Sequence, residues 1–131
     1  MRRLSLLIPP FACAACIISP PVVLPVDTTA SVDQTYDCAI RSLNEMQYTI
    51  AAADRGSGFV RARRMQTHVL GTEAAYDQQT VSVYRADDGH TMLRVVPAST
   101  GDREDTRPTE NGLKDQTKLV GQCGGGVRPV P

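Results

Sequence analysis

The sequence contains no tryptophan, and aromatic residues make up only 5% of its 131 positions. Basic and acidic residues balance at 14 each. This balance is unlike the strongly basic composition of nucleic-acid-binding domains. So few aromatic side chains also give little support for a surface that stacks bases or sugars. We therefore expect no nucleic-acid partner.

Charge is also missing from residues 4–26, which follow a cationic start at Arg2 and Arg3. Five prolines interrupt this apolar stretch. They argue against a membrane-spanning helix, because proline removes a backbone donor and clashes with the preceding turn. An export signal needs only a cationic start and about 7–15 apolar residues. We predict an export signal and tether over residues 1–30, a single domain over 31–123 and a flexible tail over 124–131.

Two routes of processing are open for the export segment. Cys16 follows Ala14 and Ala15, and this stretch resembles a bacterial lipobox. In that motif the cysteine receives lipid and becomes the mature N-terminus. The stretch departs from the motif at Cys13, where leucine is usual. Lipid on Cys16 would hold the chain on a membrane of the cell envelope, facing the periplasm. Alternatively, residues 28–30 offer small side chains for ordinary signal cleavage, which would release a soluble periplasmic or secreted protein.

Beyond the export segment the chain has only two cysteines, Cys38 and Cys123, without C-x-x-C spacing. In an oxidising compartment such a pair predicts one structural disulfide. Closing a loop of about 86 residues is worth roughly 4.5 kcal/mol in the chain-entropy model. We therefore predict a Cys38–Cys123 bridge.

Hydrophobic spacing predicts two helices. Residues 31–47 place Tyr36, Ile40 and Leu43 on one stripe. The second helix is expected over residues 113–123, with Leu113, Gln116 or Thr117, and Val120 on its buried side.

Alternating residues predict strands at 48–52, 59–65, 80–86 and 91–97. The intervening residues 67–79 show no clear period and are assigned to a loop. We predict an α+β fold: a four-stranded antiparallel sheet with two helices packed on one face, in the order α-β-β-β-β-α.

The alternation separates two faces of this sheet. Small aliphatic side chains face the helices: Val60, Ala62, Val81, Val83, Leu93 and Val95. The other face carries an aromatic, methionine and arginine mixture that is typical of protein interfaces. We call its members the outer-face residues: Phe59, Arg61, Arg63, Tyr84, Met92, Arg94 and Val96. They are a candidate surface for an envelope protein partner, with an ordinary half-solvated sheet face as the alternative.

Catalytic and metal-binding patterns are scarce. Neither His68 nor His90 has neighbouring ligands at the spacing that a zinc site requires. The acidic residues of 102–110 are interleaved with arginines, which oppose cation binding. We therefore expect no metal, no cofactor and no enzyme. A carrier that holds a small ligand between helices and sheet is the alternative, and a small enzyme ranks below it.

Three segments carry a family resemblance: residues 36–43, 48–50 and 58–62. Their patterning resembles small bacterial envelope lipoproteins of unknown function. The layout is also similar to the helix-grip domains of outer-membrane assembly lipoproteins. The resemblance implies an anchored, non-catalytic module that faces the periplasm, and it assigns no catalytic residue. We expect a lipid-anchored binding or accessory module of the cell envelope.

Overall fold

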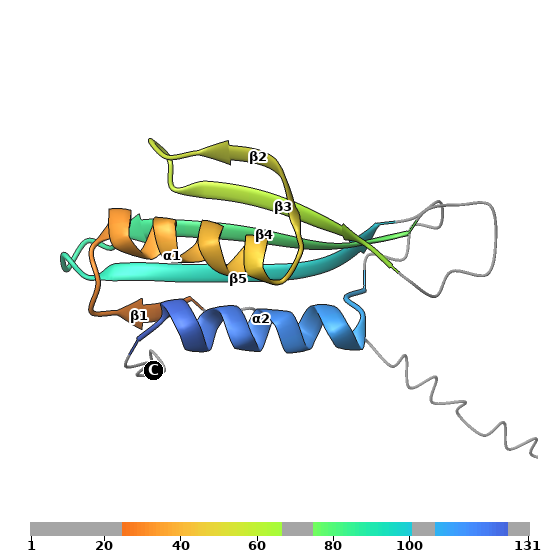
Figure 1. The fold of residues 1–131 in the computed structure, drawn as a ribbon. Coiled ribbons are helices and arrows are strands. Elements are labelled where there is room, and N and C mark those ends of the chain that lie inside the picture. Colours follow the sequence, from red (N-terminus) through yellow and green to blue (C-terminus); the bar gives the residue numbers. More distant parts are fainter. Residues whose placement is uncertain (1–24, 67–74, 101–106, 126–131) are drawn as a thin grey trace, which may run out of the picture.

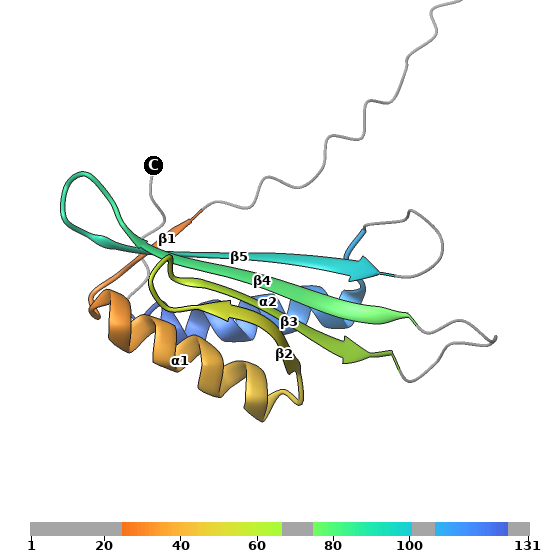
Figure 2. The ribbon, with the colours of Figure 1, turned by 90° about the horizontal axis from the view of Figure 1, so that it is seen from above.

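The computed structural model describes residues 25–66, 75–100 and 107–125. Its strands form one antiparallel sheet in the order β1-β5-β4-β3-β2, and both helices lie on the same side of it (Figures 1 and 2). The elements along the chain are β1 Val26–Thr28, α1 Val32–Glu45, β2 Thr49–Asp54, β3 Phe59–Met65, β4 Tyr76–Arg85, β5 Thr91–Thr100 and α2 Glu110–Cys123. The predicted α+β class, antiparallel sheet and two helices are confirmed.

The predicted strand number and order are wrong, because the sheet has five strands and the first precedes α1. Val26, Asp27 and Thr28 pair with Leu93, Met92 and Thr91 of β5. These three residues lie inside the segment assigned to export. A strand so short has too few positions for alternation to be visible, and only its partner on β5 defines it.

Both ends of α1 are set by local hydrogen bonds. Ser31 caps the start, where its side chain accepts a bond from the Gln34 N–H and the Gln34 side chain accepts one from the Ser31 N–H. This is a capping box. At the other end Gln47 has a φ of 64°, and the Tyr48 N–H donates to the Leu43 carbonyl over 2.9 Å. The left-handed residue reverses the chain and delivers it directly into β2.

Gly58 permits the close approach of the β2–β3 turn to β4. Its φ is 69°, and a Cβ atom built on it would lie 1.9 Å from the Val83 carbonyl oxygen. The Val83 N–H donates to the Gly58 carbonyl over 2.8 Å. Any larger residue would therefore push the turn away from β4 and break this contact.

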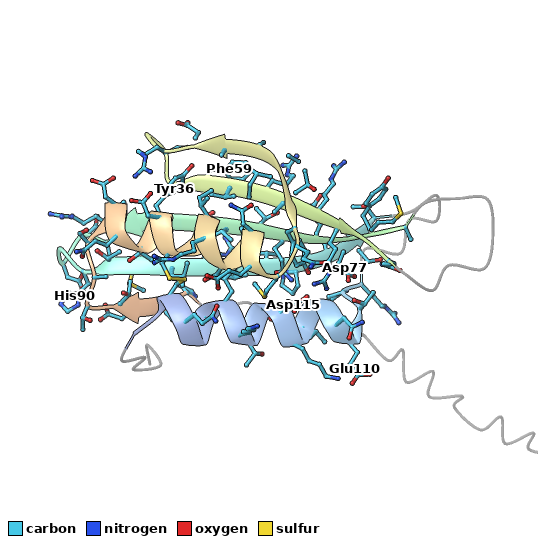
Figure 3. All side chains as sticks on the ribbon, in the orientation of Figure 1. Tyr36, Phe59, Asp77, His90, Glu110 and Asp115 are labelled. Carbon is cyan, nitrogen blue, oxygen red and sulfur yellow. A yellow bond between two sulfur atoms is a disulfide. The ribbon has the colours of Figure 1, made fainter. Side chains whose placement is uncertain are left out.

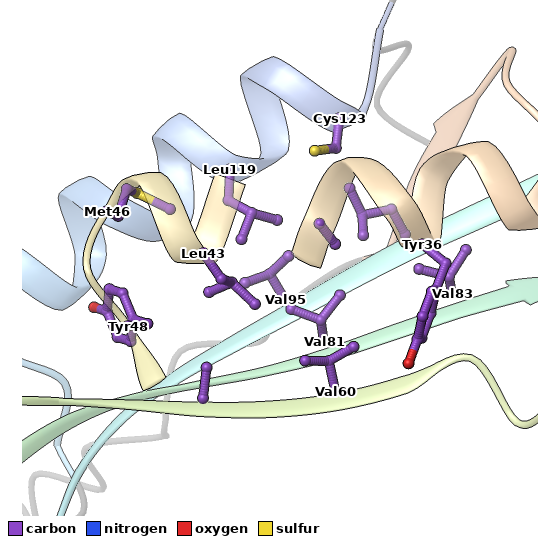
Figure 4. Close-up of a cluster of buried hydrophobic side chains, with 13 residues drawn as sticks. Tyr36, Leu43, Met46, Tyr48, Val60, Val81, Val83, Val95, Leu119 and Cys123 are labelled. Carbon is purple, nitrogen blue, oxygen red and sulfur yellow. The ribbon is translucent and has the colours of Figure 1, made fainter. Parts of the chain in front are cut away.

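The core lies between the helices and the sheet (Figure 4). Leu43 from α1 and Leu119 from α2 are completely buried. They pack on the six predicted inward residues of β3, β4 and β5, each at most 1% exposed: Val60, Ala62, Val81, Val83, Leu93 and Val95. The predicted inward face of the sheet is thus confirmed.

The predicted buried side of α2 is partly wrong. Leu113 is 41% exposed, whereas Gly112, Leu119 and Cys123 are buried. The helix begins earlier than predicted, with Thr109 as its N-cap. The rotation of α2 about its axis is fixed by tertiary contacts that the spacing of apolar residues does not reveal. One of them is the hydrogen bond that the Gly112 carbonyl accepts from the Gln79 side chain of β4.

A disulfide joins Cys38 in the middle of α1 to Cys123 at the end of α2, with Cα atoms 5.6 Å apart. The Ser42 hydroxyl lies 3.4 Å from the Cys123 sulfur. The cross-link therefore fixes the two helices to each other above the sheet.

The third predicted strand is longer than expected, since β4 begins at Tyr76. Asp77 and Gln79 face the helices and are at most 3% exposed. Polar residues at inward positions conceal a strand from an analysis based on hydrophobic alternation. These two side chains belong to the polar cluster described below.

Candidate functional sites

The outer-face residues occupy the side of the sheet opposite the helices. Across β4, the strand register places Arg61 in line with Val96 and Phe59 in line with Arg94. Arg61, Arg63 and Arg94 are exposed, and Phe59 and Val96 are half-buried. The one departure is Met92, which is only 8% exposed. Met92 therefore offers little surface to a partner.

The three outer-face arginines have no ion pair with any described carboxylate. The Arg61 guanidinium lies 5.5 Å from the centre of the Phe59 ring, close enough for a cation–π interaction. Arg63 donates from Nε to the Gln78 side chain over 3.1 Å. These contacts orient two of the cations without neutralising them.

The acidic residues at the rim of this face are engaged elsewhere. Asp54 accepts hydrogen bonds from the Ser57 hydroxyl and the Gly56 N–H, and these bonds lower the pKa of its carboxyl. Asp27 lies 2.8 Å from Nδ1 of His90. Both carboxylates thus stay at the rim with partners of their own, and no described carboxylate forms an ion pair with the arginines at the centre of the outer face.

A second polar site lies on the helix side, where Asp77 and Asp115 approach each other at the end of the sheet (Figure 3). Arg64 of β3 donates to both carboxylates and, over 2.9 Å, to the Met46 carbonyl at the end of α1. Its guanidinium also lies 4.5 Å from the centre of the Tyr48 ring. This one side chain thus connects α1, β4 and α2.

Further hydrogen bonds complete this polar cluster. The Tyr48 hydroxyl donates to Asp115 over 2.9 Å and accepts from the Gln79 side chain over 3.4 Å. The Thr109 hydroxyl donates to Asp77 over 2.6 Å. Burial is the main reason that the pKa of Tyr48 rises to about 12, and the bond to Asp115 adds to it. The phenol therefore stays protonated and acts as a donor.

The surroundings of the cluster indicate a structural role. A hollow of about 460 Å³ lies beside it, lined in part by Lys114, Asp115 and Gln66. The carboxylates that reach this hollow are already bonded to Arg64, so they are neither free bases nor free ligands. The Gln79 Oε1 atom is buried without a partner, but Gln79 does not line the hollow.

A second hollow, of about 870 Å³, lies where β1 meets the β4–β5 hairpin. His90 sits at this end of the molecule (Figure 3), bonded to Asp27. An aspartate can orient a histidine that acts as a general base. Within the described chain, however, no hydroxyl or thiol is hydrogen-bonded to Nε2 of His90. The pair connects the hairpin to β1 and provides no positioned nucleophile.

Several predicted sites lie outside the described residues: Cys16, His68, residues 102–106 and the tail beyond Gly125. In the described ranges, no group of three or more acidic, histidine or cysteine side chains could hold a metal ion. None of the helices in those ranges is both long and apolar enough to cross a membrane.

Comparison with known proteins adds no relative. A scan against protein-family models finds no match, and a search of curated proteins finds none either.

Proposed function

We propose that this chain is an exported, non-catalytic binding module, lipid-anchored at Cys16 in the cell envelope and facing the periplasm. One observation carries the choice of anchor. Strand β1 belongs to the sheet, because Val26–Thr28 pair with β5. Processing at Cys16 keeps this strand, whereas ordinary cleavage after Ala30 removes it.

Cleavage after Ala30 would also disturb α1. Ser31 would become the N-terminal residue, and its charged amino group would stand at the N-cap of the helix. The positive end of the helix dipole lies there, so an added positive charge is unfavourable. The edge of β5 from Thr91 to Leu93 would lose its partner strand at the same time. Cleavage at Cys16 avoids both costs.

Binding is favoured over catalysis by what each site offers. Both carboxylates of the polar cluster are bonded to Arg64, and among the described residues no hydroxyl or thiol is hydrogen-bonded to His90. Side chains fill the space between helices and sheet, where a small-ligand carrier would need its cavity. The binding role is therefore assigned to the outer face, whose arginines form no ion pair with any carboxylate in the described ranges.

Intact-mass spectrometry of the protein isolated from the envelope tests the anchor. We expect a mature chain that begins at Cys16 and carries lipid, and a membrane-fraction protein that becomes soluble with Cys16→Ser. A matched Cys13→Ser variant should stay in the membrane fraction. A mature N-terminus at Ser31 would overturn the proposal.

A further inference from the structure

The outer face presents three exposed arginines, Arg61, Arg63 and Arg94. Neither of the two hollows described above is lined by an outer-face residue. Arg61, Arg63 and Arg94 stand on two strands that are separated by β4. Neighbouring strands are about 4.8 Å apart, so the cations spread over roughly 10 Å or more. Such a layout suits a broad negative surface better than a single small anion.

We propose that the outer face binds the anionic headgroups of the membrane in which the chain is anchored. This inference rests on the proposed function, since the lipid on Cys16 brings the domain to that surface. Nine residues, 17–25, separate Cys16 from β1. They reach at most about 30 Å, which holds the start of β1 within that distance of the headgroups. A short tether of this kind gives a weak contact a high effective concentration.

Charge complementarity selects this occupant. Each arginine near an anionic membrane strengthens binding about fivefold, and none of the three has a described carboxylate to compete with the lipid. Arginine forms bidentate hydrogen bonds with phosphate groups. Phe59 and Val96, half-buried between the cations, give the face an apolar part suited to the region just below the phosphates. An acidic protein segment would use the same cations and is the competing occupant.

Hydroxyl-radical footprinting of the protein isolated from the envelope tests the contact. The probes are vesicles of phosphatidylcholine alone and vesicles that contain about one third phosphatidylglycerol. We expect oxidation of Phe59 and Tyr84 to fall several-fold with anionic vesicles only. Leu113, exposed on α2, should be oxidised equally with both. The protection should disappear at about 1 M salt, where the screening length is about 3 Å.

A matched pair of charge reversals locates the effect. Arg61→Glu with Arg94→Glu should abolish the protection. Arg41→Glu with Lys118→Glu changes the net charge equally on exposed helix positions and should preserve it. All four substitutions are at exposed residues, and near-ultraviolet circular dichroism verifies that each double variant is folded.

Three outcomes would overturn the inference: equal oxidation with both vesicles, equal loss of protection in the two double variants, or stronger protection by soluble polyglutamate. The last would assign the face to an acidic protein chain. The mass of the same sample reports on Cys16 separately. Lipid on Cys16 without protection overturns the headgroup contact alone, whereas protection without lipid supports that contact and overturns the anchor.

Discussion

Arg63 and Arg64 are neighbours on β3, yet their surroundings are opposite. Arg64 points toward the helices, where two carboxylates and a backbone carbonyl accept its hydrogen bonds. Arg63 points to the outer face and has only the Gln78 side chain as a partner. A charge under the helices is tolerated because its hydrogen bonds are satisfied. On the outer face the same side chain remains available to a partner.

The comparison extends to the whole sheet. Its covered face carries the stability of the domain through packed aliphatic side chains, the polar cluster and the disulfide. Its outer face contributes charge and little burial. Substitutions on the covered face should therefore change stability, whereas substitutions on the outer face should change binding.

The largest effect should come from the link between the helices. Replacing Cys38 and Cys123 together with serine should lower the free energy of unfolding by about 4 kcal/mol, because the unfolded chain regains the entropy of a long open loop. Urea denaturation of the double variant measures this. A loss below about 1 kcal/mol would mean that packing alone holds α2 in place.

Alanine substitutions of the neighbouring residues Arg64 and Arg63 should differ in their effect on stability. Arg64→Ala leaves Asp77 and Asp115 without their cation, and Asp77 is almost fully buried. Breaking such a pair should cost about 3 kcal/mol. Arg63→Ala should change stability by about 0.5 kcal/mol or less. Thermal and urea unfolding of the two variants compares them directly, and similar losses would contradict the division between the faces.

A matched pair on β5 makes the same comparison without charge. Val95 is 1% exposed and faces the helices, whereas Val96 is half-buried on the outer face. Val95→Ala should destabilise the domain by about 2.5 kcal/mol through lost burial and a residual cavity. Val96→Ala should cost about 0.5 kcal/mol. A large loss for Val96 would show that the outer face is covered in the isolated protein.

Alkaline pH should lower the stability of the domain through Tyr48 of the polar cluster. Folding raises the pKa of Tyr48 from 10.0 to about 12, so the folded state holds the phenol proton more tightly than the unfolded chain does. This contribution is complete below pH 10 and is lost as the pH rises through 12, by about 3 kcal/mol in total, of which about 2 kcal/mol is lost by pH 11.5. Urea midpoints at pH 9 and 11.5 measure the loss. Tyr48→Phe should remove that part of the pH dependence, and an unchanged dependence would refute the assignment.

How far the sequence could predict this molecule differs between the faces as well. The outer face and the aliphatic inward face follow from alternation alone, since valines at every second position mark the covered side of β4 and β5. The polar cluster does not follow. Arg64 and Asp115 are 51 residues apart, and no local spacing connects them. The first half of β4 was also missed, because the inward side chains of Asp77 and Gln79 are polar and interrupt the alternation of apolar and polar residues.

Two errors have the same physical origin. Strand β1 exists only through its pairing with β5, so its three residues carry no pattern of their own. The rotation of α2 depends on the Gln79 bond to Gly112 and on Cys123, rather than on the apolar residue Leu113. In both cases tertiary contacts override the local signal.

The smallest predicted effect touches neither face. Gln47 is exposed and has a φ of 64°, a conformation that glycine adopts without steric cost. Gln47→Gly should therefore stabilise the domain by about 0.5–1 kcal/mol, despite the greater freedom of glycine in the unfolded chain. Gln47→Ala keeps the Cβ atom and serves as the control, with little change expected. If glycine destabilised the domain, the Gln47 side chain would have to contribute more to the free energy of unfolding than its exposure suggests. A gain would instead show that the turn from α1 into β2 stores strain independently of the packing on the covered face.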